Sequence, residues 1–126
     1  MPRVYIVNAQ PEERSAFCLL LLDINMEIVG EASDWQTTLE QAPHTRFNVL
    51  LVDTGLLPAG SAKPIEELRR RCTNRFVAIA ISDQDARQHS ALIVGADDFI
   101  SKSEPPKRLM ERIQTAAKSL RREQGT

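Results

Sequence analysis

The sequence predicts a doubly wound α/β fold, in which helices cover both faces of a five-stranded parallel sheet. The main observation is that extended apolar segments alternate with helical segments five times along the chain. The extended segments are continuous apolar runs, as expected for parallel strands that are covered on both faces. The composition agrees, because 126 residues with 42% hydrophobic side chains suit one domain that buries a core without disulfides.

The first half of the chain contains three extended runs separated by two helical segments. Residues 4–7 are an unbroken run of Val, Tyr and Ile that ends at a turn-like segment, and residues 26–32 form a second strand. The helix predicted over 12–22 follows a proline and begins with two glutamates, which the helix dipole favours at that end. A short helix over 35–41 ends before a proline, and residues 48–53 (NVLLVD) are the clearest buried strand.

The second half continues the alternation after a Gly- and Pro-containing loop over 54–63. Its segments are, in order, helical, extended, helical, extended and helical: 64–72, 76–81, 84–94, 98–101 and 106–122. The first of these helices has two glutamates at its front and three arginines at its rear, the favourable order for the dipole. The middle helix is expected to be capped by Ser82 or Asp83 and ended by Gly95.

Several classes of protein are disfavoured by composition and motifs. The longest apolar run, Ala16 to Leu22, is far shorter than a membrane helix requires, and no signal peptide is visible. The net charge of −1 argues against a nucleic-acid-coating protein, and no phosphate-loop, dinucleotide-binding or zinc-protease motif is present. Cys18 and Cys72 are interpreted as buried small hydrophobic residues. We therefore expect a cytoplasmic domain that neither enters a membrane nor binds nucleic acid directly.

Polar residues follow three strands that should end at the same edge of the sheet, where ligands of such folds bind. Asp53 ends its strand and could bind a cation, act as a nucleophile or merely form a turn. Ser82 could donate its hydroxyl to an anion or cap the next helix, and Lys102 could pair with Asp53 or remain solvated. Together an acid, a hydroxyl and an amine are the partners that a phosphorylated carboxylate needs.

With these residues the chain resembles a known family, the receiver domains of two-component response regulators. The resemblance covers residues 3–122. The similarity is most specific at 48–53, 77–82 and 95–102. The segment 28–34 resembles receivers that precede a LuxR-type helix-turn-helix output domain.

The resemblance implies a flavodoxin-like, CheY-like three-layer αβα sandwich with strands in the order 2-1-3-4-5. It implies that the first and last helices share one face of the sheet, with the other three helices on the opposite face. Asp53 matches the phosphoacceptor, Ser82 the hydroxyl residue, Phe99 the aromatic switch residue and Lys102 the family's lysine. The receiver would span 1–122, with 123–126 as a tail or the start of a linker. Its expected partner is a histidine kinase or another signalling protein.

The sequence departs from the family where Mg²⁺ usually binds. Asn8 and Ala9 occupy the places of the usual adjacent acids, which leaves Asp53 and the Gly55 backbone carbonyl as matched ligands, helped by the Asn8 amide oxygen. Glu12 and Glu13 begin the next helix, and nothing in the sequence indicates that they reach inward. We expect Mg²⁺ to bind weakly or not at all, and Lys102 to pair directly with Asp53.

A second departure lies in the loop after the acceptor. Pro58 comes five residues after Asp53, whereas the family's proline usually comes four after it. We therefore expect a reshaped rim of the site over residues 54–60.

Two hypotheses remain for the mechanism. In one, the domain is a working phosphoacceptor that controls an attached DNA-binding output domain. In the other, which the lost acids favour, it is a degenerate receiver with weak Mg²⁺-dependent phosphorylation. A homodimer is expected through the helices over 12–22 and 106–122, with Met110 near the rim, or through the face that residues 84–122 form.

Overall fold

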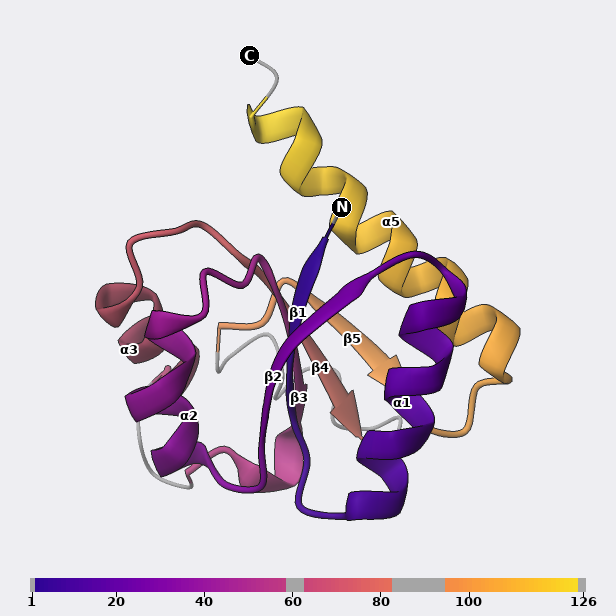
Figure 1. Cartoon of the computed structure of the whole chain (residues 1–126), viewed down its shortest axis with the longest axis horizontal. Coiled ribbons are helices and arrows are strands. Elements are labelled where there is room, and N and C mark those ends of the chain that lie inside the picture. The colour runs from indigo at the N-terminus through magenta and orange to yellow at the C-terminus, as the bar shows by residue number, and fades with distance from the viewer. Residues whose placement is uncertain (1, 59–62, 83–94, 125–126) are drawn as a thin grey trace.

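The computed structural model describes residues 2–58, 63–82 and 95–124, and the side chains of its last helix as far as Lys118. Within these residues the chain forms one five-stranded sheet with helices on both faces (Figure 1). Every neighbouring pair of strands is parallel, and the order is β2-β1-β3-β4-β5. The strands are β1 Arg3–Val7, β2 Glu27–Ala32, β3 Val49–Asp53, β4 Val77–Ser82 and β5 Asp98–Ser101. The predicted fold class and strand order are confirmed.

The predicted helices are present wherever the structure describes the chain. They are α1 Pro11–Asp23, α2 Trp35–Gln41, α3 Pro64–Arg71 and α5 Pro106–Gln124, joined by the 3-10 turns η1 Ala42–His44 and η2 Thr54–Leu56. Their bounds lie within two residues of the prediction, and η2 replaces part of the expected loop. The helix predicted over 84–94 lies outside the described residues, as does Asp83, one of its two expected caps.

Two apolar layers hold the helices against the sheet. Alternate side chains of a strand point to opposite faces, so within β3 Val49 and Leu51 contribute to one layer and Leu50 and Val52 to the other. The first layer includes buried side chains of α1 and α5, and the second includes buried side chains of α2 and α3. Figure 1 shows these two pairs of helices on opposite sides of the sheet, as predicted.

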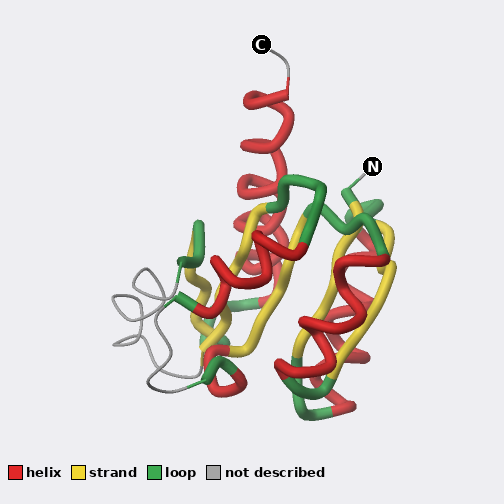
Figure 2. Tube along the Cα trace, turned by 90° about the vertical axis from the view of Figure 1, so that its left-hand side faces the viewer, coloured by secondary structure: helices red, strands yellow, loops and turns green. Residues whose placement is uncertain are grey.

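The inner face of α5 is apolar. Its residues Leu109, Ile113, Ala116 and Ala117 are buried, and Met110 is half-buried at the rim. The last turns of α5 extend beyond the sheet (Figure 2). No helix among the described residues is both long and apolar enough to cross a membrane.

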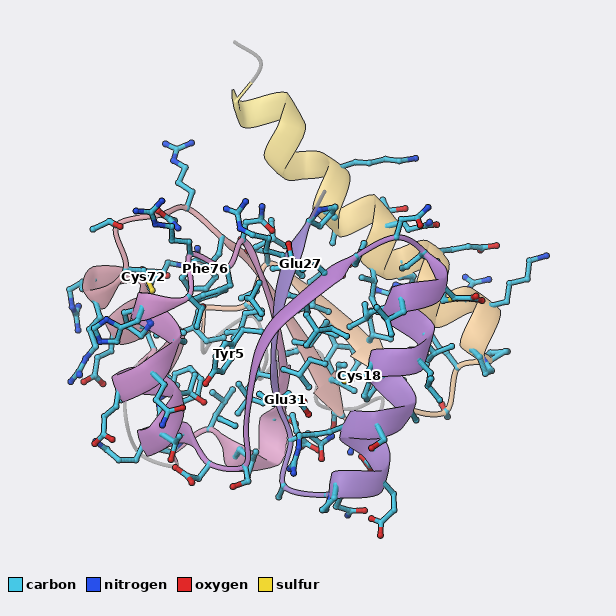
Figure 3. The ribbon with its side chains drawn as sticks, in the orientation of Figure 1. Tyr5, Cys18, Glu27, Glu31, Cys72 and Phe76 are labelled. Atoms are coloured by element: carbon cyan, nitrogen blue, oxygen red, sulfur yellow. The ribbon has the colours of Figure 1, made fainter. Side chains whose placement is uncertain are left out.

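The two cysteines differ from the prediction of burial. Cys18 and Cys72 are free thiols that are only half-buried, each packed against the edge of a different apolar layer. Figure 3 shows Cys18 within α1 and Cys72 directly after α3, on opposite sides of the sheet. Burial raises the pKa of both thiols above its ordinary value.

Candidate functional site

The carboxyl edge of the sheet brings together the three polar residues that the sequence analysis placed there. Asp53 ends β3, Ser82 ends β4 and Lys102 directly follows β5. The register of β4 and β5 aligns their ends, because Ser82 lies opposite Ser101. The backbone N–H of Lys102 then donates to the Ser82 carbonyl at 2.8 Å. The backbone at this edge therefore fixes where the Lys102 side chain begins.

The Lys102 ammonium is hydrogen-bonded to carboxylates from two different elements. Its Nζ donates to Asp53 Oδ2 at 2.7 Å, to Glu13 Oε1 at 2.6 Å and to Glu13 Oε2 at 3.2 Å. The side chains of Lys102, Glu13 and Asp53 are 16%, 29% and 21% exposed, respectively. We call this arrangement the Glu13–Lys102–Asp53 triad. The predicted pairing of Lys102 with Asp53 is confirmed.

The second oxygen of Asp53 has a partner in its own loop. Oδ1 accepts a hydrogen bond from the Gly55 N–H at 2.9 Å, and this bond closes the start of η2. Asp53 is therefore both a turn-forming aspartate and an ion-pair partner, with one oxygen for each contact. Of the three roles that the sequence left open for Asp53, the turn is therefore present together with an ion pair, and the role as nucleophile stays a prediction.

Glu13 is the site residue that the sequence analysis missed. The prediction left both glutamates of this helix without an inward role, which is wrong for Glu13 and fits the exposed Glu12. The overlooked signal is spacing, because Glu13 lies four and eight residues before the buried side chains of Phe17 and Leu21. Residues at this spacing share one face of a helix, so the sheet-facing side of α1 also carries Glu13 to the site.

The side chain of Asn8 is buried and is a second hydrogen-bond partner of Glu13, in addition to Lys102. Its Nδ2 donates to Glu13 Oε1 at 3.2 Å, while its Oδ1 accepts from the Gln10 N–H at 2.8 Å. Arg14 donates to the Asn8 backbone carbonyl, so the turn between β1 and α1 is held at several points. Asn8 therefore acts within the protein as a tether for Glu13 and for the backbone.

The electrostatics of the triad keep Lys102 charged. Burial alone would lower the pKa of Lys102, because an ammonium group loses solvation there. Hydrogen bonds to Asp53 and Glu13, together with their charges, outweigh burial and raise the pKa above its ordinary value. Lys102 is therefore a fixed cation beside Asp53 at neutral pH.

The same contacts do not fit a Mg²⁺ ion, which prefers six oxygen ligands including one or two carboxylates. The ammonium lies between the two carboxylates, and the Asn8 amide directs its NH₂ group toward Glu13. Ala9 offers no side-chain oxygen, and the Asn8 oxygen already accepts a backbone N–H. Across residues 2–58, 63–82 and 95–124 we find no group of three or more His, Cys, Asp or Glu side chains placed to hold a metal ion.

Phe99 lies within β5 rather than at the rim. Its side chain is buried in the layer under α2 and α3. Its backbone carbonyl accepts from Arg112 of α5, which also donates to Asp98 at 3.1 Å and to Glu104 at 2.8 Å. The loop that carries Lys102 is thereby tied to α5, and Ser101 and Ser103 share a hydroxyl hydrogen bond of 2.7 Å within it.

A parallel sheet in this order, with an aspartate, a serine and a lysine at its carboxyl edge, defines a signal-receiving domain of the response-regulator class. The family of response regulator receiver domains matches residues 4–114, and the chain belongs to that family.

Particular relatives agree with this assignment. The chain is 29% identical over 118 residues to the nitrate/nitrite response regulator protein NarP of Escherichia coli K12, covering 92% of this chain and 55% of NarP. It is 26% identical over 122 residues to the phosphate regulon transcriptional regulatory protein PhoB of the same strain, covering 94% and 52%. The chain thus spans about half the length of these curated relatives.

Solved receiver structures are similar over nearly the whole chain. The receiver domain of the response regulator AraT from Geobacillus stearothermophilus is 27% identical with a TM-score of 0.78, covering 97% of both chains. The receiver domain of the putative response regulator NarL from Mycobacterium tuberculosis is 25% identical with a TM-score of 0.78, covering 93% of this chain and 96% of that one.

Proposed function

We propose that this domain is an atypical receiver of two-component signalling, in which Asp53 is the phosphoacceptor and Mg²⁺ contributes little. The observation that carries the proposal is the 2.7 Å hydrogen bond from the Lys102 ammonium to Asp53, at the carboxyl edge of the sheet. A carboxylate with a fixed cation beside it is suited to receive an anionic group, because the cation offsets the added charge.

The proposed transfer uses the residues at this edge. An Asp53 oxygen bonds to the phosphorus of a phosphohistidine on a kinase. The P–N bond breaks, and the imidazole nitrogen keeps the electron pair and takes up a proton. Lys102 offsets the negative charge on the new phosphoryl group, and the Ser82 hydroxyl is the expected donor to one of its oxygens. Rearrangement of Ser82 and Phe99 would then pass the change to the face around β5.

The atypical part of the proposal rests on the loss of acids at positions 8 and 9. A divalent ion supplies neutralising charge on a transferred phosphoryl group when it is bound. Here Asn8 and Ala9 replace the family's acids, and the single positive charge of Lys102 stands beside Asp53. We therefore expect slow transfer from small donors such as acetyl phosphate.

A fully active phosphoacceptor that controls an attached DNA-binding output domain is the second candidate. The retained Asp53, Ser82 and Lys102 favour it, as does the similarity of residues 28–34 to receivers that precede LuxR-type output domains. In both candidates the domain works in the cytoplasm, is not itself an enzyme, and has a histidine kinase or another signalling protein as partner.

The homodimer stays a prediction. Leu19 and Leu22 on α1 are 71% and 59% exposed, and this apolar surface could be covered by a second copy. Sedimentation at high protein concentration tests the prediction, and a purely monomeric result would contradict it.

Phosphate-affinity electrophoresis with acetyl phosphate and Mg²⁺ tests the proposed function. The unmodified domain should be labelled slowly or not at all. Replacing Asn8 and Ala9 by aspartate should restore rapid labelling, and adding Asp53→Asn should abolish it. Rapid Mg²⁺-dependent labelling of the unmodified domain would favour the second candidate, whereas labelling that survives Asp53→Asn would remove Asp53 as acceptor.

A further inference from the structure

The Lys102 ammonium lies between carboxylates that are remote from each other in sequence. Asp53 ends a strand, whereas Glu13 lies in the first turn of α1 and contacts Nζ with both of its oxygens, at 2.6 and 3.2 Å. All three side chains are mostly shielded from solvent. A lysine that only needed a counter-ion would be satisfied by Asp53, so the contact with Glu13 calls for its own account.

We propose that Glu13 is a positioning residue that holds Lys102 against Asp53, so that the ammonium acts as a built-in cation and closes the carboxylate to divalent ions. The consequence for signalling rests on the proposed function, because it matters only if Asp53 is the acceptor. The placement of Lys102 and the exclusion of divalent ions do not depend on phosphoryl transfer.

A purely local role for Glu13 accounts for less of the geometry. Acids in the first turn of a helix are favourable through the dipole, and Glu12 meets that description equally well. Glu12 is exposed, whereas Glu13 turns inward, accepts from the Asn8 amide at 3.2 Å and reaches Lys102. Glu12 is therefore a control for Glu13, because of these two glutamates only Glu13 contacts Lys102.

The charges explain how the arrangement competes with a metal ion. Glu13 and Asp53 contact the same nitrogen atom, Nζ of Lys102, so a divalent ion could bind both carboxylates only by displacing the ammonium. The Asn8 NH₂ group, which also faces Glu13, is a hydrogen-bond donor and offers no ligand. Without the lysine side chain, the two carboxylates would remain close together with unsatisfied negative charge.

Removal of Lys102 should therefore create a divalent-ion site that depends on Glu13. In Mn²⁺ titrations followed by electron paramagnetic resonance, Lys102→Met should bind at least tenfold more tightly than the unmodified domain. Adding Glu13→Gln should abolish that gain, adding Glu12→Gln should retain it, and Lys107→Met, at an exposed lysine of α5, should bind like the unmodified domain. No gain in Lys102→Met, or a gain that Glu13→Gln leaves intact, would overturn the proposal.

A second measurement keeps Lys102 and so does not depend on the folding of its variants. Acylation of lysine amines by an N-hydroxysuccinimide ester, read by peptide mass spectrometry, should be several-fold faster at Lys102 in Glu13→Gln than in the unmodified domain. Glu12→Gln should leave the rate unchanged. Equal Lys102 rates in the two glutamate variants would show that Glu13 does not position it. Neither readout uses phosphoryl transfer, so a domain that is never phosphorylated could still pass both tests.

Discussion

Replacing Lys102 by Met should destabilise the domain, because it removes the only side chain that we find joining the carboxylates of Glu13 and Asp53 among the described residues. Exposed ion pairs contribute about 0.2–1 kcal/mol, whereas removing one partner of a buried pair costs about 3–5 kcal/mol. With exposed fractions of 16–29%, the triad lies between these limits. We expect a loss of about 2 kcal/mol in the free energy of unfolding.

The pH dependence of this loss follows from the pKa of Lys102. Folding raises that pKa above its ordinary value of 10.5, so the stabilisation is complete below about 10.5 and is lost as pH rises through the folded value. The difference between the unmodified domain and Lys102→Met should therefore be constant between about pH 6 and 9.

Urea unfolding followed by circular dichroism measures both effects, with Lys107→Met as the matched control at an exposed lysine. The control should change the free energy of unfolding by less than about 0.5 kcal/mol. A Lys102→Met loss no larger than that of the control, at neutral pH, would show that the triad does not stabilise the fold.

Three further predictions test the packing around the site. Gly30→Ala should lower the free energy of unfolding in urea by about 1–3 kcal/mol. The reason is that the alanine Cβ would lie 2.5 Å from Cε2 of the buried Tyr5 ring. An unchanged unfolding midpoint would contradict this contact. Arg112→Met should lower the free energy of unfolding by about 1–2 kcal/mol, because its guanidinium joins α5 to β5. The control Arg108→Met, on the exposed face of α5, should lower it by less than about 0.5 kcal/mol. Equal losses in the two variants would contradict the role of Arg112 in joining α5 to the sheet. The two cysteines, whose thiol pKa values are raised by burial, should react with a disulfide reagent at pH 8 at least tenfold more slowly in the folded than in the urea-unfolded chain. Equal cysteine rates would contradict that shielding.

The alternation of strands and helices was sufficient to predict the sheet and the position of Asp53 at its edge. Continuous apolar runs such as VLLV are explained well by burial on both faces. The strand order then places the residues after β3 and β5 at the same edge of the sheet, on either side of β4. The contact of Lys102 with Asp53 follows from that order and from opposite charge. The apolar runs recur along the chain, and the parallel strands all end at one edge of the sheet. A single sequence is therefore enough to predict these features.

Glu13 could not be predicted with the same ease, because its position already had an adequate local explanation. An acid in the first turn of a helix is stabilised by the dipole whichever way it points. Only its spacing from the buried Phe17 and Leu21 distinguishes Glu13 from Glu12. That spacing indicates a site residue only once its partner, Lys102, is known. The half-burial of the cysteines was missed for a related reason, since sequence does not show where an apolar layer ends.

The central claim, that Lys102 stands beside Asp53 as a fixed cation and Mg²⁺ is held weakly, is tested most directly by a Mg²⁺ titration followed in ¹H–¹⁵N spectra. The Gly55 amide donates to Asp53 and the Asn8 side-chain amide donates to Glu13, so these two signals report on the two carboxylates. We predict no saturable shift of either signal up to about 10 mM Mg²⁺ in the unmodified domain, and a saturable shift of the Gly55 signal once Asn8 and Ala9 are replaced by aspartate. Saturation of the Gly55 signal at millimolar Mg²⁺ or below in the unmodified domain would contradict the central claim.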